Sequence, residues 1–202
     1  RDGGRVRRVE ALDRVAVVVV VVSGTHGVEG YLGSALQRRH LASLAGGALD
    51  GPTIVFIHAL NPFGFSWVRR VNEDNVDLNR NFVDWALPLR ANPAYTELAD
   101  ILVPGDWSAA TQERTLLELL VKLEEVGMDR IQQVISGGQY AHPTGVFYGG
   151  TAPVWSNRWL RGFLGDRLAS VRRAAIIDLH TGLGPWGHGE LISSDEPTSA
   201  MY

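Results

Sequence analysis

Eight consecutive apolar residues at positions 15–22, seven of them valine, constrain the fold of this chain more than any other feature. The run is far shorter than the ~20 apolar residues that a membrane-spanning helix needs. β-Branched residues favour strands, and an apolar run without polar alternation indicates a strand that is covered on both faces. Such strands are typical of parallel sheets, so the run predicts a buried strand in an α/β domain.

Two later segments, residues 53–58 and 174–180, have the same nearly continuous apolar character. Segments with helical apolar spacing lie between and around them, at residues 31–44, 92–103, 109–126, 128–135 and 155–171. Alternating strands and helices predict parallel strands joined by right-handed crossovers. We therefore expect a single domain over residues 1–202 with an α/β fold, in which three layers, α/β/α, surround a mostly parallel (mixed) central sheet. The three strands should be adjacent and buried, and residues 190–193 should add a fourth strand.

The composition excludes several kinds of site. The chain has no cysteine, which rules out disulfides, thiol catalysis and cysteine-ligated metals. Any metal must therefore be bound by His, Asp or Glu. The formal charge of -3 provides no general attraction for nucleic acid or for an anionic membrane. Because no secretory signal is visible, we expect a cytoplasmic protein without nucleic-acid or membrane partners.

Polar residues follow all three predicted strands. They are Gly24, Thr25, His26 and Glu29 after the first strand, His58 and Asn61 after the second, and Asp178 and His180 at the end of the third. In open α/β sheets, ligands bind at the carboxyl ends of the strands. The sequence therefore predicts a functional site at this edge of the sheet.

A metal site can be built from these residues. His26 and Glu29 are three residues apart on a glycine-flanked turn, where an imidazole nitrogen and a carboxylate oxygen can converge on one point. His180 would complete a two-histidine, one-glutamate set, which is the ligand set of hydrolytic zinc sites with an open fourth position. Asp178 faces the same side of its strand as His180 and could orient that histidine. Without the third ligand, a helix-capping histidine beside a surface glutamate explains the first pair equally well.

A second group of polar residues lies between positions 61 and 82. Asn79 and Arg80 end a short segment, and Arg69 and Arg70 precede them. Arginine and asparagine near a metal suit an anionic substrate group, because guanidinium offers two parallel hydrogen bonds to a carboxylate. The alternative is a solvated loop whose arginines pair with the neighbouring acidic residues, Glu73, Asp74 and Asp77.

Four motifs in this order resemble the zinc carboxypeptidase superfamily related to carboxypeptidase A, and more narrowly its bacterial branch of uncharacterised metallopeptidase-like proteins. The chain is also similar to the aspartoacylase and succinylglutamate desuccinylase group. The motifs are Gly24-Thr-His-Gly-Val-Glu29, Asn61-Pro-Phe-Gly64, Asp77-Leu-Asn-Arg-Asn-Phe82 and Asp178-Leu-His180. Together they lie within residues 23–184, and the resemblance implies a zinc-carboxypeptidase-like fold.

The resemblance implies one Zn²⁺ ion bound by His26, Glu29 and His180. It also implies substrate-carboxylate contacts from Asn79 and Arg80. A catalytic arginine that stabilises the oxyanion is implied at Arg70 or Arg69, which the motif does not distinguish.

A glycine- and aromatic-rich loop at residues 137–150 is typical of the bacterial branch. We expect it to form a pocket wall in which Tyr140 or His142 contacts substrate. For His142 the alternative is a packed aromatic loop that satisfies the imidazole.

The resemblance also implies a general-base glutamate well beyond the third metal ligand. Only 22 residues follow His180, and the acidic residues among them, Glu190, Asp195 and Glu196, are not at the distance found in the family. We therefore expect the domain to be truncated at its C-terminus and the base to lie outside this chain.

These features predict a zinc-dependent hydrolase that cleaves an amide bond next to a carboxylate, as a metallocarboxypeptidase does, in a small peptide. The first alternative is a deacylase of N-acyl amino acids on the same scaffold. The second is a non-catalytic module that binds a metal or a carboxylate. A nucleotide-binding protein is disfavoured, because the first strand–turn contains neither G-x-G-x-x-G nor G-K-[ST].

Overall fold

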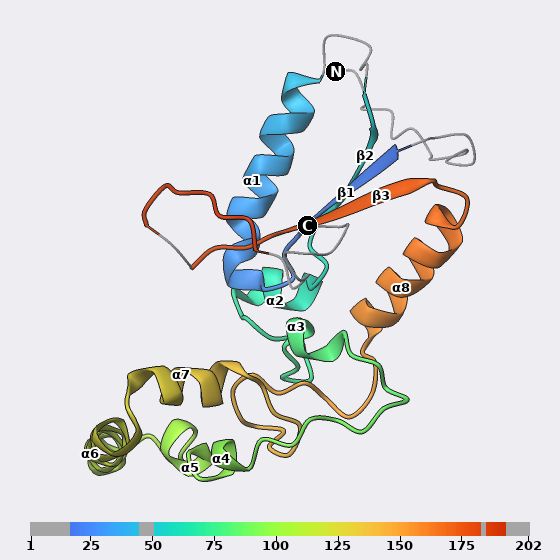
Figure 1. The fold of residues 1–202 in the computed structure, drawn as a ribbon. Helices are drawn as coiled ribbons and strands as arrows, with labels where there is room; N and C mark the ends of the chain where they lie inside the picture. Colours follow the sequence, from blue (N-terminus) through green and yellow to red (C-terminus); the bar gives the residue numbers. More distant parts are fainter. Residues whose placement is uncertain (1–16, 45–50, 183–184, 193–202) are drawn as a thin grey trace.

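The computed structural model describes residues 17–44, 51–182 and 185–192 (Figure 1). In chain order the elements are β1 (Val17–Ser23), α1 (Gly27–Ser43), β2 (Thr53–Ile57), α2 (Pro62–Trp67), α3 (Leu78–Asn81), α4 (Pro93–Thr96), α5 (Ala99–Leu102), α6 (Ala109–Val126), α7 (Met128–Ser136), α8 (Trp155–Leu168) and β3 (Arg173–Leu179).

The three strands form one sheet in the order β2-β1-β3, and both pairings are parallel. Val22 of β1 lies opposite Ile57 on one side and Asp178 on the other, so all three strands end at the same edge. The prediction of an α/β fold with adjacent parallel strands is confirmed. Within the described residues the sheet is entirely parallel and not mixed. Residues 190–192 form no strand, and residue 193 lies outside the described part of the chain.

A helix packs on each face of the sheet at the central strand β1, with α8 on one face and α1 on the other (Figure 1). On one face Val18, Val20 and Val22 are buried in a core cluster with Leu160 of α8. On the other face α1 approaches so closely that a Cβ on Gly33 would lie 2.7 Å from the Cβ of Ser23. Within Val17–Ser23, the even-numbered valines thus pack toward α8, and Ser23 packs against α1 on the opposite face.

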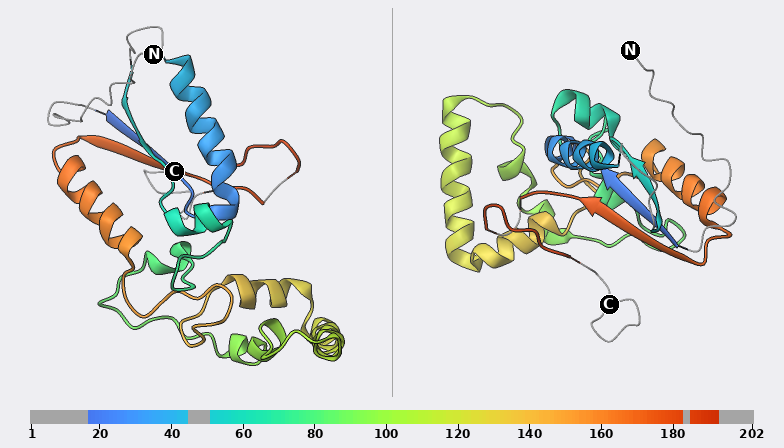
Figure 2. Two further views of the ribbon diagram at one scale, coloured as in Figure 1. Left: turned by 180° about the vertical axis from the view of Figure 1, so that it is seen from behind. Right: turned by 90° about the horizontal axis from the view of Figure 1, so that it is seen from above.

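The prediction that all three strands are buried is wrong for β3. Among the described residues this strand is at the edge of the sheet (Figure 2), and Ile176 is 54% exposed. β2, at the opposite edge, is half-buried apart from the buried Ile57. An apolar run indicates a strand but does not specify its neighbours, so the central position of β1 could not be distinguished from an edge position.

The helices α4–α7 lie together at one end of the molecule, clear of the sheet (Figures 1 and 2). They form a second core cluster, which contains Tyr95, Leu98, Ile131 and Val134. The predicted helix over residues 92–103 is divided into α4 and α5. None of the helices in the described residues is long and apolar enough to cross a membrane.

Candidate metal centre

The turn between β1 and α1 holds the first two candidate ligands in place. His26 is the N-cap residue of α1, and Glu29 lies in the first turn of that helix. Gly24 has φ of +69°, and a Cβ there would lie 2.8 Å from the Cα of Ala59. A Cβ on Gly27 would lie 1.9 Å from the carbonyl of Gly64. The glycines therefore allow the turn to pack against the backbone that follows β2, which fixes the position of His26.

The structure brings His26, Glu29 and His180 together, as the sequence predicts. Their ligand atoms all lie within 4.8 Å of one another. Glu29 is between the two histidines, with Oε1 2.9 Å from Nδ1 of His26 and Oε2 3.3 Å from Nδ1 of His180. The two imidazole rings meet edge-on with their centroids 5.0 Å apart. This arrangement follows from the parallel register, which places the ends of β1 and β3 side by side.

Each histidine is oriented by an aspartate on its far nitrogen. Nε2 of His26 is 3.0 Å from Oδ1 of Asp77, and Nε2 of His180 is 2.8 Å from Oδ2 of Asp178. An ionised carboxylate can only accept a hydrogen bond, so in the metal-free protein each imidazole donates from Nε2 to its aspartate and can donate from Nδ1 to Glu29 in the same way. Both Nδ1 atoms therefore face Glu29 and are the atoms that can bind a metal.

The orienting role of Asp178 was predicted from its strand position, whereas that of Asp77 was not predicted. Asp77 is fully buried and caps α3 by accepting from the backbone N–H of Asn79. The sequence shows that Asp77 lies two residues before Asn79. Its contact with His26 depends on how α3 packs against the turn after β1, which the sequence does not show.

The charges in this cluster stabilise one another. Burial lowers the pKa of His26, but hydrogen bonds to Asp77 and Glu29 outweigh it and raise that pKa above its ordinary value. Hydrogen bonds to Asp178 and Glu29 raise the pKa of His180 to about 10. Burial opposes ionisation of Glu29, yet its bonds to His180 and His26 bring its pKa well below the usual range. In the metal-free protein the protonated histidines thus balance the charge of the surrounding carboxylates. A bound cation could take over this role from the histidine protons.

The donor set fits a metal ion. Two imidazole nitrogens and one carboxylate converge, and each imidazole is backed by a second carboxylate, which is the usual support for metal-bound histidine. Glu29 is 12% exposed and His180 is 30% exposed, so the centre opens to solvent on the His180 side. The triad could therefore hold a metal ion with one side accessible.

The structure distinguishes the two candidate arginines. Nε of Arg70 donates to Oδ2 of Asp77 at 2.9 Å, and Nη1 lies 3.5 Å from Oε1 of Glu29. Arg69 is exposed and contributes its backbone carbonyl, which accepts from the N–H of Gly27. Arg70 is therefore the arginine whose side chain reaches the candidate metal centre. The alternative from the sequence, in which the arginines pair with neighbouring acidic residues, is observed for Arg70, which pairs with Asp77.

The hydrogen bonds of Arg80 are made to groups outside the triad. Its guanidinium donates to the carbonyls of Ser136 and Asn79, and in the described residues no carboxylate lies within ion-pair distance of it. The guanidinium groups of Arg80 and Arg70 both lie over the ring of Phe147, at 5.4 and 4.8 Å from its centroid. Phe147, which the sequence analysis did not single out, thus connects Arg80 to the candidate centre.

The two candidates from the loop at residues 137–150 are in different surroundings. The hydroxyl of Tyr140 donates to the carbonyl of Arg80 at 2.7 Å, so this tyrosine lies beside the arginine. Nε2 of His142 is 2.9 Å from the hydroxyl of Thr96, and its ring packs against Tyr95. The structure therefore places His142 in the packed arrangement that was the alternative to substrate contact.

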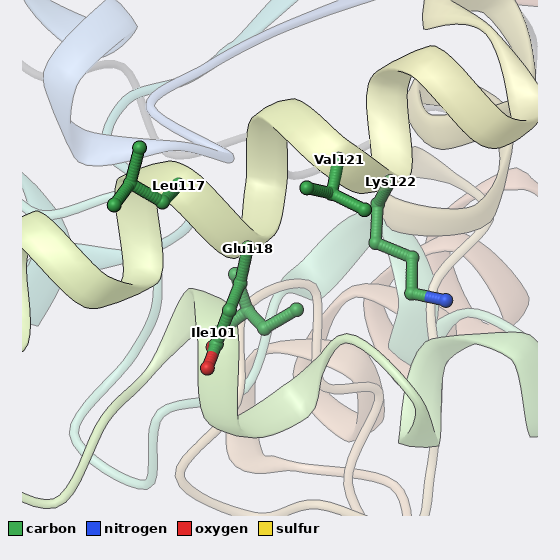
Figure 3. Close-up of a pocket in the computed structure, with 5 residues that line it drawn as sticks. All are labelled: Ile101, Leu117, Glu118, Val121 and Lys122. Carbon is green, nitrogen blue, oxygen red and sulfur yellow. The ribbon is translucent and has the colours of Figure 1, made fainter.

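A groove elsewhere on the molecule contains none of the predicted site residues. It lies between α5 and α6, and its lining residues are Ile101, Leu117, Glu118, Val121 and Lys122 (Figure 3). The lining is mostly apolar and offers no set of metal ligands. The candidate metal ligands thus lie at the strand ends and not in this groove.

Comparison with known proteins gives a family but no activity. No curated protein and no solved structure matches the chain. Residues 6–202 match the model of a family described as protein of unknown function, DUF2817. Because this match covers nearly the whole sequence, the chain belongs to the DUF2817 family.

Proposed function

We propose that this protein is a zinc-dependent hydrolase, with a zinc-carboxypeptidase-like fold, that cleaves an amide bond next to a carboxylate. The observation that carries the proposal is the paired arrangement of His26 and His180. Each has Nε2 bound to an aspartate and Nδ1 directed at Glu29. Ion pairing alone would not require two imidazoles to present the same nitrogen to one carboxylate.

Zinc is the metal that this donor set suits best, because two histidines and a glutamate are the protein ligands of hydrolytic zinc sites with an open position. When bound, zinc polarises a substrate carbonyl and lowers the pKa of a water molecule toward ~7. The solvent-accessible side of the triad, beside His180, is the side from which substrate would approach.

Arg70 is the proposed oxyanion-binding residue. A guanidinium has five N–H donors, so Arg70 can keep its bonds to Asp77 and Glu29 and still donate to the oxygen of a tetrahedral intermediate. The bond to the fully buried Asp77 holds the side chain in position before substrate arrives.

Arg80 and Asn79 are the proposed binding site for the substrate carboxylate, with Tyr140 beside them. The guanidinium of Arg80 is partly buried and donates to neutral carbonyls, so no carboxylate in the described residues neutralises its charge. It therefore favours an anion, and the planar fork matches a carboxylate. Its link to the triad through Phe147 and Arg70 supports the cleavage of a bond close to that carboxylate.

The substrate is a small peptide or an N-acyl amino acid with a free carboxylate. Activity is tested on the complete gene product. Zinc-loaded protein is incubated with peptides, N-acyl amino acids and the matching C-terminal amides, and amino-acid release is measured.

We expect amino-acid release either from the peptides or from the N-acyl amino acids that have a free carboxylate. A chelator should abolish this activity, and added zinc should restore it. The variant His40→Ala, which changes an exposed histidine on α1, serves as the matched control and should retain activity. Zinc binding without hydrolysis of any substrate would contradict the enzymatic proposal and favour the non-catalytic binding module.

A further inference from the structure

The three candidate ligands come from two separate strand ends. His26 and Glu29 follow β1, whereas His180 follows β3. The backbone pairing of these strands extends to Ser23 opposite Leu179 and ends there. Beyond this point the spacing between the ligands depends on side-chain contacts.

One of these contacts joins the two strand ends through the residue that precedes His26. Thr25 is 2% exposed, and its hydroxyl oxygen lies 2.9 Å from both carboxylate oxygens of Asp178. The hydroxyl donates its proton to this carboxylate, which also accepts from Nε2 of His180 at 2.8 Å. A continuous hydrogen-bonded chain therefore runs from Thr25 through Asp178 to His180.

We propose that Thr25 is a positioning residue of the metal centre: its hydroxyl fixes the Asp178 carboxylate, and through it the ring of His180, against the turn that bears His26 and Glu29. This inference rests on the proposed function, because it assumes that the triad binds a metal. It assigns a role to the threonine of the first motif, which is not one of the candidate metal ligands.

The two orienting aspartates differ in how firmly they are held. Asp77 is fully buried and accepts from the N–H of Asn79 and from Arg70, besides its bond to His26. The Asp178 side chain is 32% exposed, so water competes for its oxygens. The terminal torsion of an aspartate is broad and roughly two-fold, so a second anchor is needed to keep one oxygen on His180. The buried Thr25 hydroxyl supplies that anchor.

The test compares zinc affinity in three variants of the metal-free protein, by competition with a chelator of known affinity. Loss of a group that orients a ligand typically weakens metal binding by about 10–100-fold. Thr25→Val keeps the shape but removes the hydroxyl, and we expect a loss of roughly that size. Thr25→Ser keeps the hydroxyl and should restore nearly the wild-type affinity.

The matched control is Thr111→Val. Thr111 is also buried, and its hydroxyl donates to Asp106 at 2.8 Å at the start of α6, remote from the triad. This variant should leave zinc affinity unchanged. The visible absorption of bound Co²⁺ supplies a second measurement, and we expect it to change in Thr25→Val and not in Thr111→Val.

The coupling to Asp178 keeps the inference testable if Thr25→Val folds poorly. In an Asp178→Ala background, adding Thr25→Ser or Thr25→Val should cause no further loss of zinc affinity. Wild-type affinity and an unchanged Co²⁺ spectrum in Thr25→Val would overturn the role of Thr25 alone, as would equal losses in Thr25→Val and Thr25→Ser. Failure of the wild-type protein to bind zinc would instead overturn the metal centre, and this inference with it.

Discussion

Both candidate histidine ligands have carboxylates at both ring nitrogens, so each holds its proton more tightly than a free imidazole does. For His180 the pKa of about 10 lies above the ordinary value of 6.5. Its charge therefore stabilises the metal-free fold fully below pH 6.5, and that contribution is lost as the pH rises through about 10. A metal ion can bind Nδ1 of His180 only after this nitrogen has lost its proton.

Metal binding at pH 7 should therefore release protons. We expect about one proton or more per ion, and a zinc affinity that rises with pH up to about 10, because His180 must be deprotonated first. Calorimetric titration in two buffers with different ionisation enthalpies measures the number of protons released per zinc ion. Zinc binding without proton release would show that the ion does not replace the histidine protons.

The role of Arg80 can be tested on the intact enzyme. Arg80→Ala should lower kcat/KM by about two to four powers of ten on a substrate with a free carboxylate. The substitution removes the guanidinium that would pair with the substrate carboxylate and leaves that carboxylate without its partner. The loss should largely vanish on the matching amide. Arg80 also donates to the carbonyl of Ser136, so an equal loss on both substrates would assign it a structural role.

At the scale of elements, the packing of α1 against the backbone after β2 determines where the ligands are. Gly27→Ala should destabilise the fold by about 3 kcal/mol, because the new Cβ would lie 1.9 Å from backbone atoms of Gly64. Gly162→Ala is the matched control on α8, where a Cβ has open space. It should stabilise the helix by roughly 0.5–1 kcal/mol. Urea unfolding measures both, and equal effects would contradict the packing argument.

How far the sequence predicts the elements depends on whether the information is local. The valine run and the leucine spacing of α6 are local, so β1 and α6 were predicted with nearly correct bounds. The edge position of β3 and the division of residues 92–103 depend on neighbours in space, which no local pattern records. The candidate ligands were predictable because strand ends of a parallel sheet share one edge. The roles of Asp77, Thr25 and Phe147 required the packed structure.

At the scale of the whole molecule, a bound ion would join the end of β1 to the end of β3, the edge strand of the sheet in the described residues. Zinc that binds the folded state alone raises stability by about 4 kcal/mol at 1,000 times its Kd. For a chain of this size, that corresponds to a Tm increase of roughly 10 °C.

We expect this increase in thermal unfolding followed by circular dichroism, and its reversal by a chelator. His180→Ala should show no increase, because the ion loses its ligand on β3. A similar zinc-induced rise in His180→Ala would place the binding site elsewhere.

The central claim is that His26, Glu29 and His180 form one metal site. The most direct test is the zinc content of purified protein after equilibrium dialysis, measured by elemental mass spectrometry. We expect one ion per chain in the wild type and in His40→Ala, and almost none in His26→Ala, Glu29→Ala or His180→Ala. A wild-type protein without zinc, or alanine variants that retain it, would contradict the account.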